Sequence, residues 1–367
     1  MTGDTVTLIM KATRRCNLRC VYCGDWQTTS GSTMGFPVVA RTIQRALREY
    51  ARVEFIWHGG ESALLPISFY KKVMLMQGRF RRPDQVIGNT FQTNATLIDE
   101  EWARFLRDAR FAVGFSIDGP PEVHNRTRPY INGMPSFDDV SRGMAILRQY
   151  GLLDSCILVV GREVLALGAD RVFDFFQQIG IRSYSCLAVK PTIRPGESGP
   201  KGYPTDSQGV SSFMCRLYDC WLEHGDREIR IRELAAIRDR LCGKEARVCN
   251  LSGACIGRYF CVEPNGDVTH CDCFVGGQYP LGNIMDSSFA DMAASASMAK
   301  LLADNRRSLD LTRVRCGDFE LTRGGCPHSR LTALQHGRDS GPCCEHRDLI
   351  AHTRARMADE QVVPTCS

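Results

Sequence analysis

The sequence predicts an α/β protein in which a parallel sheet, open or curved into a barrel, is followed by a smaller cysteine-rich domain. About six strand-like runs alternate with helical patterns between residues 5 and 190, and repeated βα units imply a parallel sheet. From residue 249 onward the chain has short elements, many glycines and ten cysteines. A chain of 367 residues suggests about two domains. We therefore expect a first domain over residues 1–242 and a second over 243–367.

The predicted strands are nearly continuous apolar runs, as expected for parallel strands covered on both faces. They are expected at 5–12, 53–60, 86–95, 111–119, 152–161 and 181–190. Helical spacing predicts the intervening helices at 38–50, 67–80, 98–109, 136–151 and 169–180. The fourth helix has Ser136 as its predicted N-cap and ends at Gly151. Residues 194–210 are rich in Gly, Pro and Ser and predict a flexible loop, which a helical stretch follows to about residue 242.

Charge and hydropathy argue against nucleic-acid and membrane partners. The net charge of +5 is spread along the chain, and basic runs such as residues 79–83 are short and lack interleaved aromatic residues. No stretch approaches the roughly 18 consecutive apolar residues of a membrane span. The N-terminus shows neither the apolar core nor the cleavage site of a signal peptide. We therefore expect a cytoplasmic protein.

The chain has eighteen cysteines, which is unusual for a protein without an export signal. In a reducing compartment they are not expected to form a disulfide framework, so clustered cysteines indicate metal or iron–sulfur ligation. The scattered ones are expected to be small buried hydrophobic residues. These are Cys156, Cys186, Cys215, Cys220 and Cys242.

Three cysteines, Cys16, Cys20 and Cys23, follow the first predicted strand within eight positions. Three thiolates can hold three irons of a [4Fe–4S] cube, whereas an electron-transfer cluster uses four. One iron then keeps an open position for a small molecule, as catalytic zinc does. The alternative is a structural zinc loop, for which His58 is the only obvious fourth ligand.

The C-x3-C-x2-C spacing, with Tyr22 before the last cysteine, resembles the fingerprint of the radical S-adenosylmethionine (radical SAM) superfamily. The resemblance implies a partial (β/α)6 barrel of TIM type and a [4Fe–4S] cluster whose unique iron binds SAM. It also implies reductive cleavage of SAM to a 5′-deoxyadenosyl radical, with an external electron donor such as flavodoxin or ferredoxin. The radical chemistry belongs to the cofactor, which the protein positions and shields.

Further motifs follow the predicted strands, where a parallel sheet gathers functional groups. The segment 58–62 resembles the family's GGE motif, and 124–128 resembles its HDxxR segment with Asn125 in place of Asp. By resemblance Glu61 holds the amino group of SAM and Arg128 its carboxylate. The expected SAM-binding residues are Tyr22, Gly59, Gly60, Glu61, Gln92, Asn94, Ser116, Asp118 and Arg128. The alternatives to SAM binding are an ordinary turn at 58–62 and local capping of backbone groups at the strand ends. His124 is expected to be a structural hydrogen-bonding residue.

The cysteine-rich second half resembles the SPASM extension of radical SAM enzymes that modify peptides and proteins. The segments 262–272 and 281–284 carry this resemblance, which extends over nearly the whole chain together with the earlier motifs. It implies auxiliary [4Fe–4S] clusters, the first held by Cys249, Cys255, Cys271 and Cys326. Cys261 and Cys273 remain competing ligands. A zinc ribbon or knuckle is the alternative, although a C-x5-C spacing lacks the tight pairs of structural zinc sites.

The second auxiliary cluster of the family uses a C-x2-C-x5-C pattern, from which this chain departs. Arg313 and Thr322 occupy two of the cysteine positions, which leaves Cys316 with Cys344 or its neighbour Cys343. Two outcomes stay open: a cluster completed by a borrowed ligand such as His328, or the loss of this cluster.

Asp272 directly follows Cys271 and is the candidate general base. The resemblance to anaerobic sulfatase-maturating enzymes implies this role, and a carboxylate facing a closed cavity could have its pKa moved toward it. The alternative is a turn Asp that caps backbone amides. The sequence thus predicts a radical SAM enzyme that oxidises a peptide or protein side chain, forming a cross-link or converting Ser or Cys to formylglycine. A small-molecule dehydrogenase and a non-catalytic iron–sulfur or zinc protein are the other candidates.

Overall fold

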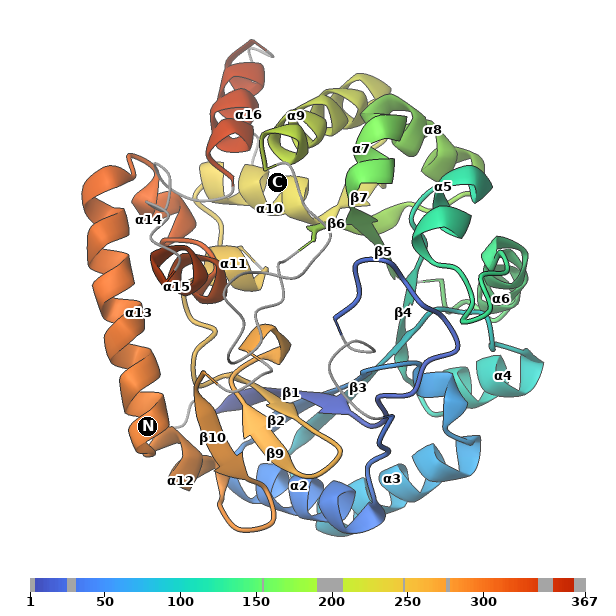
Figure 1. Ribbon diagram of the computed structural model, residues 1–367, viewed down its shortest axis with the longest axis vertical. Helices are drawn as coiled ribbons and strands as arrows, with labels where there is room; N and C mark the ends of the chain where they lie inside the picture. The colour runs from blue at the N-terminus through green and yellow to red at the C-terminus, as the bar shows by residue number, and fades with distance from the viewer. Residues whose placement is uncertain are drawn as a thin grey trace.

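The protein is built around one curved sheet, seen in a computed structural model that describes residues 4–24, 31–153, 155–189, 207–246, 248–274, 278–335 and 346–359. Within these residues the sheet has ten strands in the order β10-β9-β8-β1-β2-β3-β4-β5-β6-β7, and helices surround it (Figure 1). The strands are β1 (Thr5–Lys11), β2 (Arg52–His58), β3 (Val86–Thr93), β4 (Ala112–Ser116), β5 (Ser155–Val160), β6 (Ser183–Ala188), β7 (Arg230–Ile231), β8 (Tyr259–Val262), β9 (Asp267–Thr269) and β10 (Pro280–Asn283). The parallel α/β fold with a partial barrel is thus confirmed.

Strands β1 to β7 run parallel, so their carboxyl ends share one edge. Lys11 pairs in register with His58 at the ends of β1 and β2. The cysteine loop follows β1, and the GGE turn follows β2 at the same level. This register brings together segments that are about forty residues apart in the sequence.

Helices cover the outer face of the sheet and bury its apolar side chains. Trp57 on β2 packs edge-to-face on Tyr70 of α3, with ring centroids 5.6 Å apart. The helices are α2 (Phe36–Glu49), α3 (Ile67–Phe80), α4 (Glu100–Asp108), α5 (Pro121–Thr127), α6 (Phe137–Gln149), α7 (Arg162–Leu167), α8 (Ala169–Gln178), α9 (Ser207–His224), α10 (Arg232–Leu241), α11 (Cys249–Ser252), α12 (Phe289–Ala293), α13 (Ala296–Arg315), α14 (Phe319–Thr322), α15 (Pro327–Gln335) and α16 (Arg347–Asp359), with 3-10 turns η1 (Ser62–Leu64) and η2 (Asp272–Phe274).

The inner face of the sheet is more polar than the predicted strand patterns suggest. Because Trp57 points outward, Glu54 and His58 of the same strand point inward and are only half-buried. Glu54 accepts a hydrogen bond from the Thr90 hydroxyl of β3 at 2.7 Å. The expectation of two covered faces therefore holds for the outer face only, and the inner face carries the polar groups from which a site can be built.

The cysteine-rich region extends the same sheet. Strand β8 pairs in parallel with β1, with Ile9 opposite Cys261, and the β9–β10 hairpin continues the edge. The domain boundary between residues 242 and 243 stays a prediction. The expectation of short elements there is wrong for α13, a helix of 20 residues at the margin of the molecule (Figure 1).

Two local predictions need correction. Residues 207–210 belong to α9, while residues 194–206 of the predicted loop lie outside the described residues. Ser136 sits at the N-cap of α6, but its side chain forms no capping bond and donates instead to the carbonyl of Arg128 at 2.6 Å. The amides of Ser136 and Phe137 donate to the Asn125 side chain at 3.1 and 2.9 Å. A distant amide oxygen therefore caps this helix.

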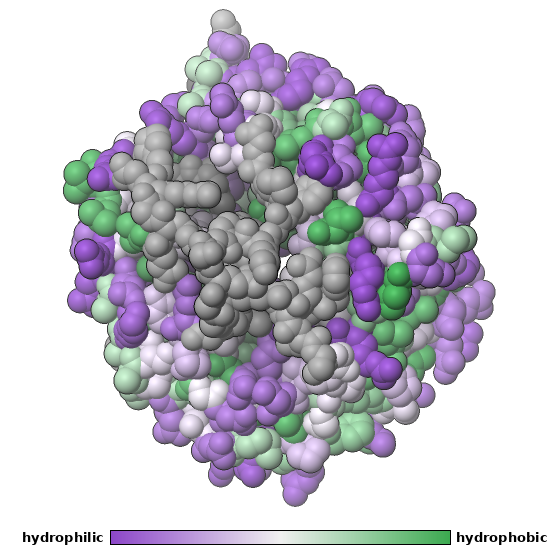
Figure 2. All heavy atoms as spheres, viewed as in Figure 1, coloured by the Kyte–Doolittle hydropathy of each residue, from purple (hydrophilic) through white to green (hydrophobic). Residues whose placement is uncertain are grey.

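Among the described helices, none combines the length and the apolar character that a membrane crossing requires. Hydrophilic side chains are frequent around the rim of the face shown in Figure 2.

A buried ion pair joins the start of the cysteine loop to the second half of the chain. Arg14 Nε lies 2.9 Å from Glu263 Oε2, and a second contact joins Nη2 to Oε1. The Arg14 side chain is 0% exposed, and that of Glu263 is 14% exposed. A bidentate pair of this kind is strongly directional, so it fixes the β8–β9 turn against the loop.

Replacing Glu263 by alanine should lower the free energy of unfolding by about 3 kcal/mol, because it removes the bidentate carboxylate partner of a buried guanidinium. The control is Asp108→Ala, which removes an exposed partner of Arg107 and should cost less than about 0.5 kcal/mol. Urea unfolding followed by circular dichroism measures both. Equal losses in the two variants would show that the pair does not hold the sheet extension.

Candidate functional site

The cysteine loop is held by backbone hydrogen bonds to the segment that follows α5. The amide of Arg19 donates to the carbonyl of Pro129 at 2.8 Å, and that of Val21 donates to Thr127 at 2.9 Å. Leu18 forms an isolated antiparallel bridge with Tyr130. Backbone hydrogen bonds thus fix the shape of the loop at several points.

The loop brings the thiols of Cys16, Cys20 and Cys23 close enough to interact electrostatically. Burial is the main cause that raises the pKa of Cys16 to about 12, and the Glu61 carboxylate adds to it. Burial also raises the pKa of Cys20 to about 12, against the lowering effect of Arg128. Three thiolates in such a place need a positive partner, so the donor set fits a cationic metal centre.

The GGE turn packs directly on the backbone of this loop. The Gly60 amide donates to the carbonyl of Thr13 and the Glu61 amide to that of Arg15, both at 2.8 Å. A Cβ on Gly60 would lie 1.9 Å from the Arg15 oxygen, and Gly59 has φ +140° with the Thr13 oxygen 2.5 Å from its Cβ position. The lack of a Cβ atom at these two positions therefore lets the turn approach the cysteine loop closely. Contact of Gly59 and Gly60 with SAM stays a prediction.

Glu61 is buried, with hydrogen bonds to both carboxylate oxygens. Oε1 accepts from the amide of Ala63 at 2.9 Å and the hydroxyl of Thr93 at 2.7 Å, and Oε2 accepts from the amide of Asn94 at 2.7 Å. Burial raises its pKa even though these bonds oppose the shift. A carboxylate offers about four acceptor positions, so one position on Oε2 is left for a further donor. Binding the amino group of SAM stays a prediction for Glu61.

Other predicted SAM contacts lie at the ends of β3 and β4. Asn94 donates to Asn17 Oδ1 at 2.9 Å and lies 3.9 Å from Cys16 Sγ, which ties it to the cysteine loop. Gln92 donates to the Ser116 hydroxyl at 3.3 Å across the two strands. The structure thus gathers these residues at one edge of the sheet, as their positions after the strands predict.

Asp118, Arg128 and Tyr22 form a buried polar network beside the cysteine loop. Asp118 Oδ2 accepts from the Tyr22 hydroxyl at 2.5 Å and lies 2.9 Å from Arg128 Nε, while Oδ1 accepts from the amide of Val159 at 3.1 Å. Burial by itself would raise the pKa of Asp118, but the adjacent guanidinium outweighs it and lowers the pKa. Through these contacts the three side chains hold the cysteine loop against β5 and the end of α5. Their contact with SAM stays a prediction.

His124 and Asn125 have structural hydrogen bonds. The amide of Asp118 donates to His124 Nδ1 at 3.3 Å, and burial lowers the pKa of this histidine to about 4, so its ring is neutral near pH 7. Asn125 accepts the two amide protons that cap α6. This acceptor role needs only a side-chain oxygen, which Asn supplies as well as the Asp of the family pattern.

The first group of C-terminal cysteines also converges. The thiols of Cys249, Cys255 and Cys326 interact electrostatically, and burial raises the pKa of Cys255 to about 12. Cys271 joins Cys249 and Cys255 around the Tyr259 side chain. Cys261 is fully buried on β8, where Lys11, Glu263, Asp272 and Arg14 act on its thiol. The donor set fits one auxiliary cluster, whose ligands stay a prediction.

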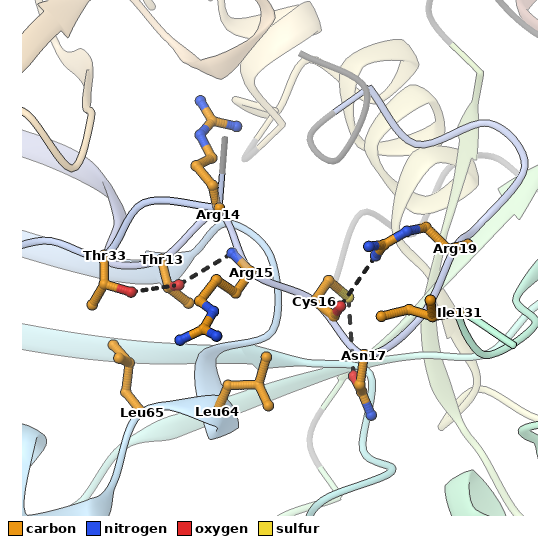
Figure 3. Close-up of a pocket in the computed structure, with 11 residues that line it drawn as sticks. Thr13, Arg14, Arg15, Cys16, Asn17, Arg19, Thr33, Leu64, Leu65 and Ile131 are labelled. Atoms are coloured by element: carbon orange, nitrogen blue, oxygen red, sulfur yellow. Dashed lines mark hydrogen bonds between the residues drawn. The ribbon is translucent and has the colours of Figure 1, made fainter. Parts of the chain in front are cut away.

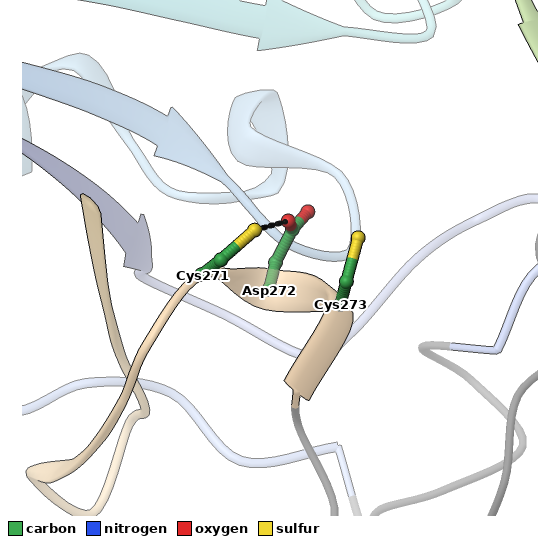
Figure 4. A group of neighbouring side chains, drawn as sticks. All are labelled: Cys271, Asp272 and Cys273. Atoms are coloured by element: carbon green, nitrogen blue, oxygen red, sulfur yellow. Dashed lines mark hydrogen bonds between the residues drawn. The ribbon is translucent and has the colours of Figure 1, made fainter. Parts of the chain in front are cut away.

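Cys271, Asp272 and Cys273 project from the same side of the η2 turn (Figure 4). Their ligand atoms lie within 4.8 Å of one another, and the Cys271 thiol donates to Asp272 Oδ1 at 3.2 Å. Asp272 Oδ2 lies 4.0 Å from the Nζ of Lys11, whose side chain is 3% exposed. The cysteine-rich region thus places a carboxylate beside the edge of the sheet from which the cysteine loop begins.

The positions of a second auxiliary cluster have other roles. The Arg313 guanidinium stacks on the Phe319 ring at 4.6 Å, and the buried Thr322 hydroxyl accepts from the amide of Gly324 at 3.2 Å. Cys316 is buried directly after α13, and its part in a second cluster stays a prediction. Cys343 and Cys344 lie outside the described residues.

Sequence reasoning missed Lys11 and the pair of Arg14 with Glu263. Lys11 closes an apolar strand, and a lysine there is a signal of a buried cation that could have been noticed. Glu263 carries no such signal, because its partner is 249 residues away.

Comparisons with known proteins agree with this geometry. The model of the Radical SAM superfamily matches residues 10–164, and that of SPASM, an iron–sulfur cluster-binding domain, matches residues 254–317. The cysteine-type anaerobic sulfatase-maturating enzyme of Clostridium novyi (strain NT) is 27% identical over 348 residues, 92% of each chain. The serine-type enzyme of Bacteroides thetaiotaomicron is 28% identical over 343 residues, 88% of this chain and 82% of the relative. A structure of native anSMEcpe with bound AdoMet and Cp18Cys peptide superposes with a TM-score of 0.81 at 26% identity, covering 97% of this chain and 99% of the other.

Substituting Gly60 by alanine should lower the iron content by one [4Fe–4S] cluster, because the new Cβ collides with the Arg15 carbonyl and forces the cysteine loop out of place. The control is Gly78→Ala on α3, where a Cβ meets nothing within 4 Å. Iron and sulfide analysis after anaerobic reconstitution measures the outcome. Equal iron content in the two variants would show that the close seating of the turn is not needed.

Proposed function

Because this chain is a radical SAM enzyme with a SPASM domain, we propose that it oxidises a Cys or Ser side chain of a peptide or protein to formylglycine. The observation that carries the proposal is the position of Asp272, next to Lys11 at the carboxyl end of β1. Resemblance over most of both chains to cysteine-type and serine-type sulfatase-maturating enzymes supports the same substrate class.

When bound, a [4Fe–4S] cluster and SAM would supply the radical chemistry that removes one hydrogen atom from the substrate. Cys16, Cys20 and Cys23 would hold that cluster. Glu61, with its remaining acceptor position, would hold the amino group of SAM. Tyr22, Gln92, Asn94, Ser116, Asp118 and Arg128 would shape the rest of the SAM site.

The residues of the second half complete the oxidation. After loss of a Cβ hydrogen atom, the substrate must release one proton and one electron to become an aldehyde or thioaldehyde. Asp272 would accept the proton from the hydroxyl or thiol. A cluster held by Cys249, Cys255, Cys271 and Cys326 would supply the electron acceptor, and the Cys271 thiol lies 3.2 Å from this carboxylate. Water then converts a thioaldehyde to the aldehyde with release of sulfide.

We further propose that the protein acts in the cytoplasm, where thiols remain reduced, and that flavodoxin or ferredoxin supplies the electron for the first cluster. The eighteen cysteines support a reducing compartment, because clusters and disulfides compete for the same thiolates.

The function is tested with anaerobically reconstituted protein, SAM, dithionite and two peptides, the Cp18Cys peptide and its Cys→Ser counterpart. We expect 5′-deoxyadenosine together with an aldehyde in at least one peptide, detected by mass spectrometry and hydrazide capture. Loss of two hydrogens without an aldehyde would assign cross-link formation instead. Formation of 5′-deoxyadenosine with unchanged peptides would contradict the proposed substrate class for these sequences.

The Asp272→Asn variant is expected to separate SAM cleavage from oxidation of the substrate. We expect SAM cleavage in the presence of peptide to persist, while aldehyde formation falls at least about 100-fold, within the range that general base catalysis contributes. Asp267→Asn, on the nearby β9 strand, is the matched control and should keep both activities. Unchanged aldehyde formation in the Asp272 variant would remove this residue as the base.

A further inference from the structure

A buried arginine, Arg330, lies one helical turn after Cys326. It belongs to α15, and its backbone amide donates to the carbonyl of Cys326 at 3.2 Å. The residue is only 6% exposed, so water does not surround its guanidinium. A guanidinium group stays protonated in proteins at any ordinary pH. A full positive charge is therefore fixed in the interior beside a proposed cluster ligand.

The guanidinium of Arg330 donates to neutral oxygens. Nη1 donates to the carbonyls of Gly324 and Gly325, the second at 2.8 Å. Nη2 donates to Asn305 Oδ1 at 2.6 Å and Nε to the Ser308 hydroxyl at 3.2 Å. Both of these acceptors belong to α13, which packs on α15 (Figure 1). These bonds satisfy most of the donors of the group, but none of them balances its charge.

The described part of the chain buries two other arginines, and both face a carboxylate. Arg14, at the start of the cysteine loop (Figure 3), pairs with Glu263, and Arg128 lies 2.9 Å from Asp118. A buried ion without a counter-charge is costly, because the interior of a protein stabilises charge less well than water. No carboxylate of the described residues pairs with Arg330, so its balancing charge has another source.

The groups that act electrostatically on Arg330 are the thiols of Cys326 and Cys255. Burial lowers the pKa of Arg330, and the two cysteines oppose this shift. Arg330 in turn opposes the effect of burial on Cys255, which raises the pKa of that thiol. The reduction potential of an iron–sulfur cluster depends on its net charge and its solvent exposure. A buried cation next to two of the expected ligands therefore suits a cluster bound by thiolates.

We propose that Arg330 is the fixed counter-charge of the auxiliary cluster at Cys255 and Cys326, and that it raises the reduction potential of this cluster. Reduction adds one negative charge to the cluster and its thiolates, and a nearby cation stabilises the form that is more negative.

The inference rests on the proposed function for the role of the cluster as electron acceptor. In that reaction the substrate radical loses one electron, the cluster gains it, and the proton of the substrate goes to Asp272. Arg330 forms and breaks no covalent bond. It acts through the cluster, by making the transfer of the electron more favourable.

The test compares Arg330→Gln with Arg330→Lys in the full-length, anaerobically reconstituted protein. Glutamine keeps N–H donors for the neighbouring carbonyls but loses the charge, whereas lysine keeps the charge without the planar fork of donors. The matched control is Arg323→Gln. Arg323 lies three residues before Cys326, but its charge is paired at the surface with Glu245 at 2.7 Å.

A redox titration followed by electron paramagnetic resonance gives the midpoint potential of the cluster in each variant. The protein in which Cys16, Cys20 and Cys23 are all replaced by alanine shows which signal does not depend on the cysteine loop. Iron and sulfide analysis measures how much cluster each variant holds.

We expect Arg330→Gln to lower the equilibrium constant for one-electron reduction of the auxiliary cluster by about tenfold or more. Tenfold corresponds to about 59 mV toward more negative potential for a one-electron couple. Arg330→Lys and Arg323→Gln should stay within about twofold of the wild type, because each leaves the buried positive charge in place.

An unchanged potential in Arg330→Gln would overturn the proposal. So would equal shifts in the Gln and Lys variants, or loss of the cluster from both, since either result would assign Arg330 to hydrogen bonding of the turn before Cys326. A protein without any signal independent of the cysteine loop would overturn it as well.

Loss of the cluster from Arg330→Gln alone would support the proposal, because it would show that the bound cluster needs this charge. The potential is measured without a peptide. Failure of the peptide assay therefore leaves this measurement intact, and the two proposals can fail separately.

Discussion

The close seating of the GGE turn on the cysteine loop is the constraint on which the rest of the site depends. Two amides of the turn donate to carbonyl groups of Thr13 and Arg15, at a separation that only glycine permits at position 60. The contact joins the ends of two neighbouring parallel strands, so the register of the sheet decides where the thiols lie. Because Glu61 continues from this turn into the interior, the same contact also orients the carboxylate that is expected to meet SAM.

Several buried charged side chains around the cysteine loop have partners of opposite charge. Asp118 accepts from Tyr22 and faces Arg128, and Glu263 neutralises Arg14. These two pairs avoid the penalty of an unpaired buried charge. In contrast, burial raises the pKa values of Cys16, Cys20 and Glu61. The thiols and this carboxylate therefore suit positively charged partners.

The pairing of β8 with β1 explains how the two halves of the chain form one structure. By pairing β8 with β1, the cysteine-rich region becomes an extension of the barrel sheet, and η2 arrives beside the end of β1. Asp272 thereby approaches Lys11, and Cys271 contacts this carboxylate while sharing the surroundings of Tyr259 with Cys249 and Cys255. Asp272, the proposed proton acceptor, and Cys271, a proposed ligand of the electron-accepting cluster, are thus brought to the barrel by backbone pairing rather than by a flexible contact between domains.

Much of this arrangement follows from local pattern. The alternation of strands and helices, the three-cysteine spacing and the polar residues closing each strand were sufficient to predict the fold class and the edge that carries the site, because parallel strands bring their carboxyl ends together whatever the helices contain. Other features depended on long-range geometry. The partner of Arg14, the closeness of Lys11 to Asp272, and the sheet continuing through β8 join residues more than 240 positions apart. Side-chain pairing over such separations leaves no periodic trace in a single sequence, so only the packed tertiary structure decides it.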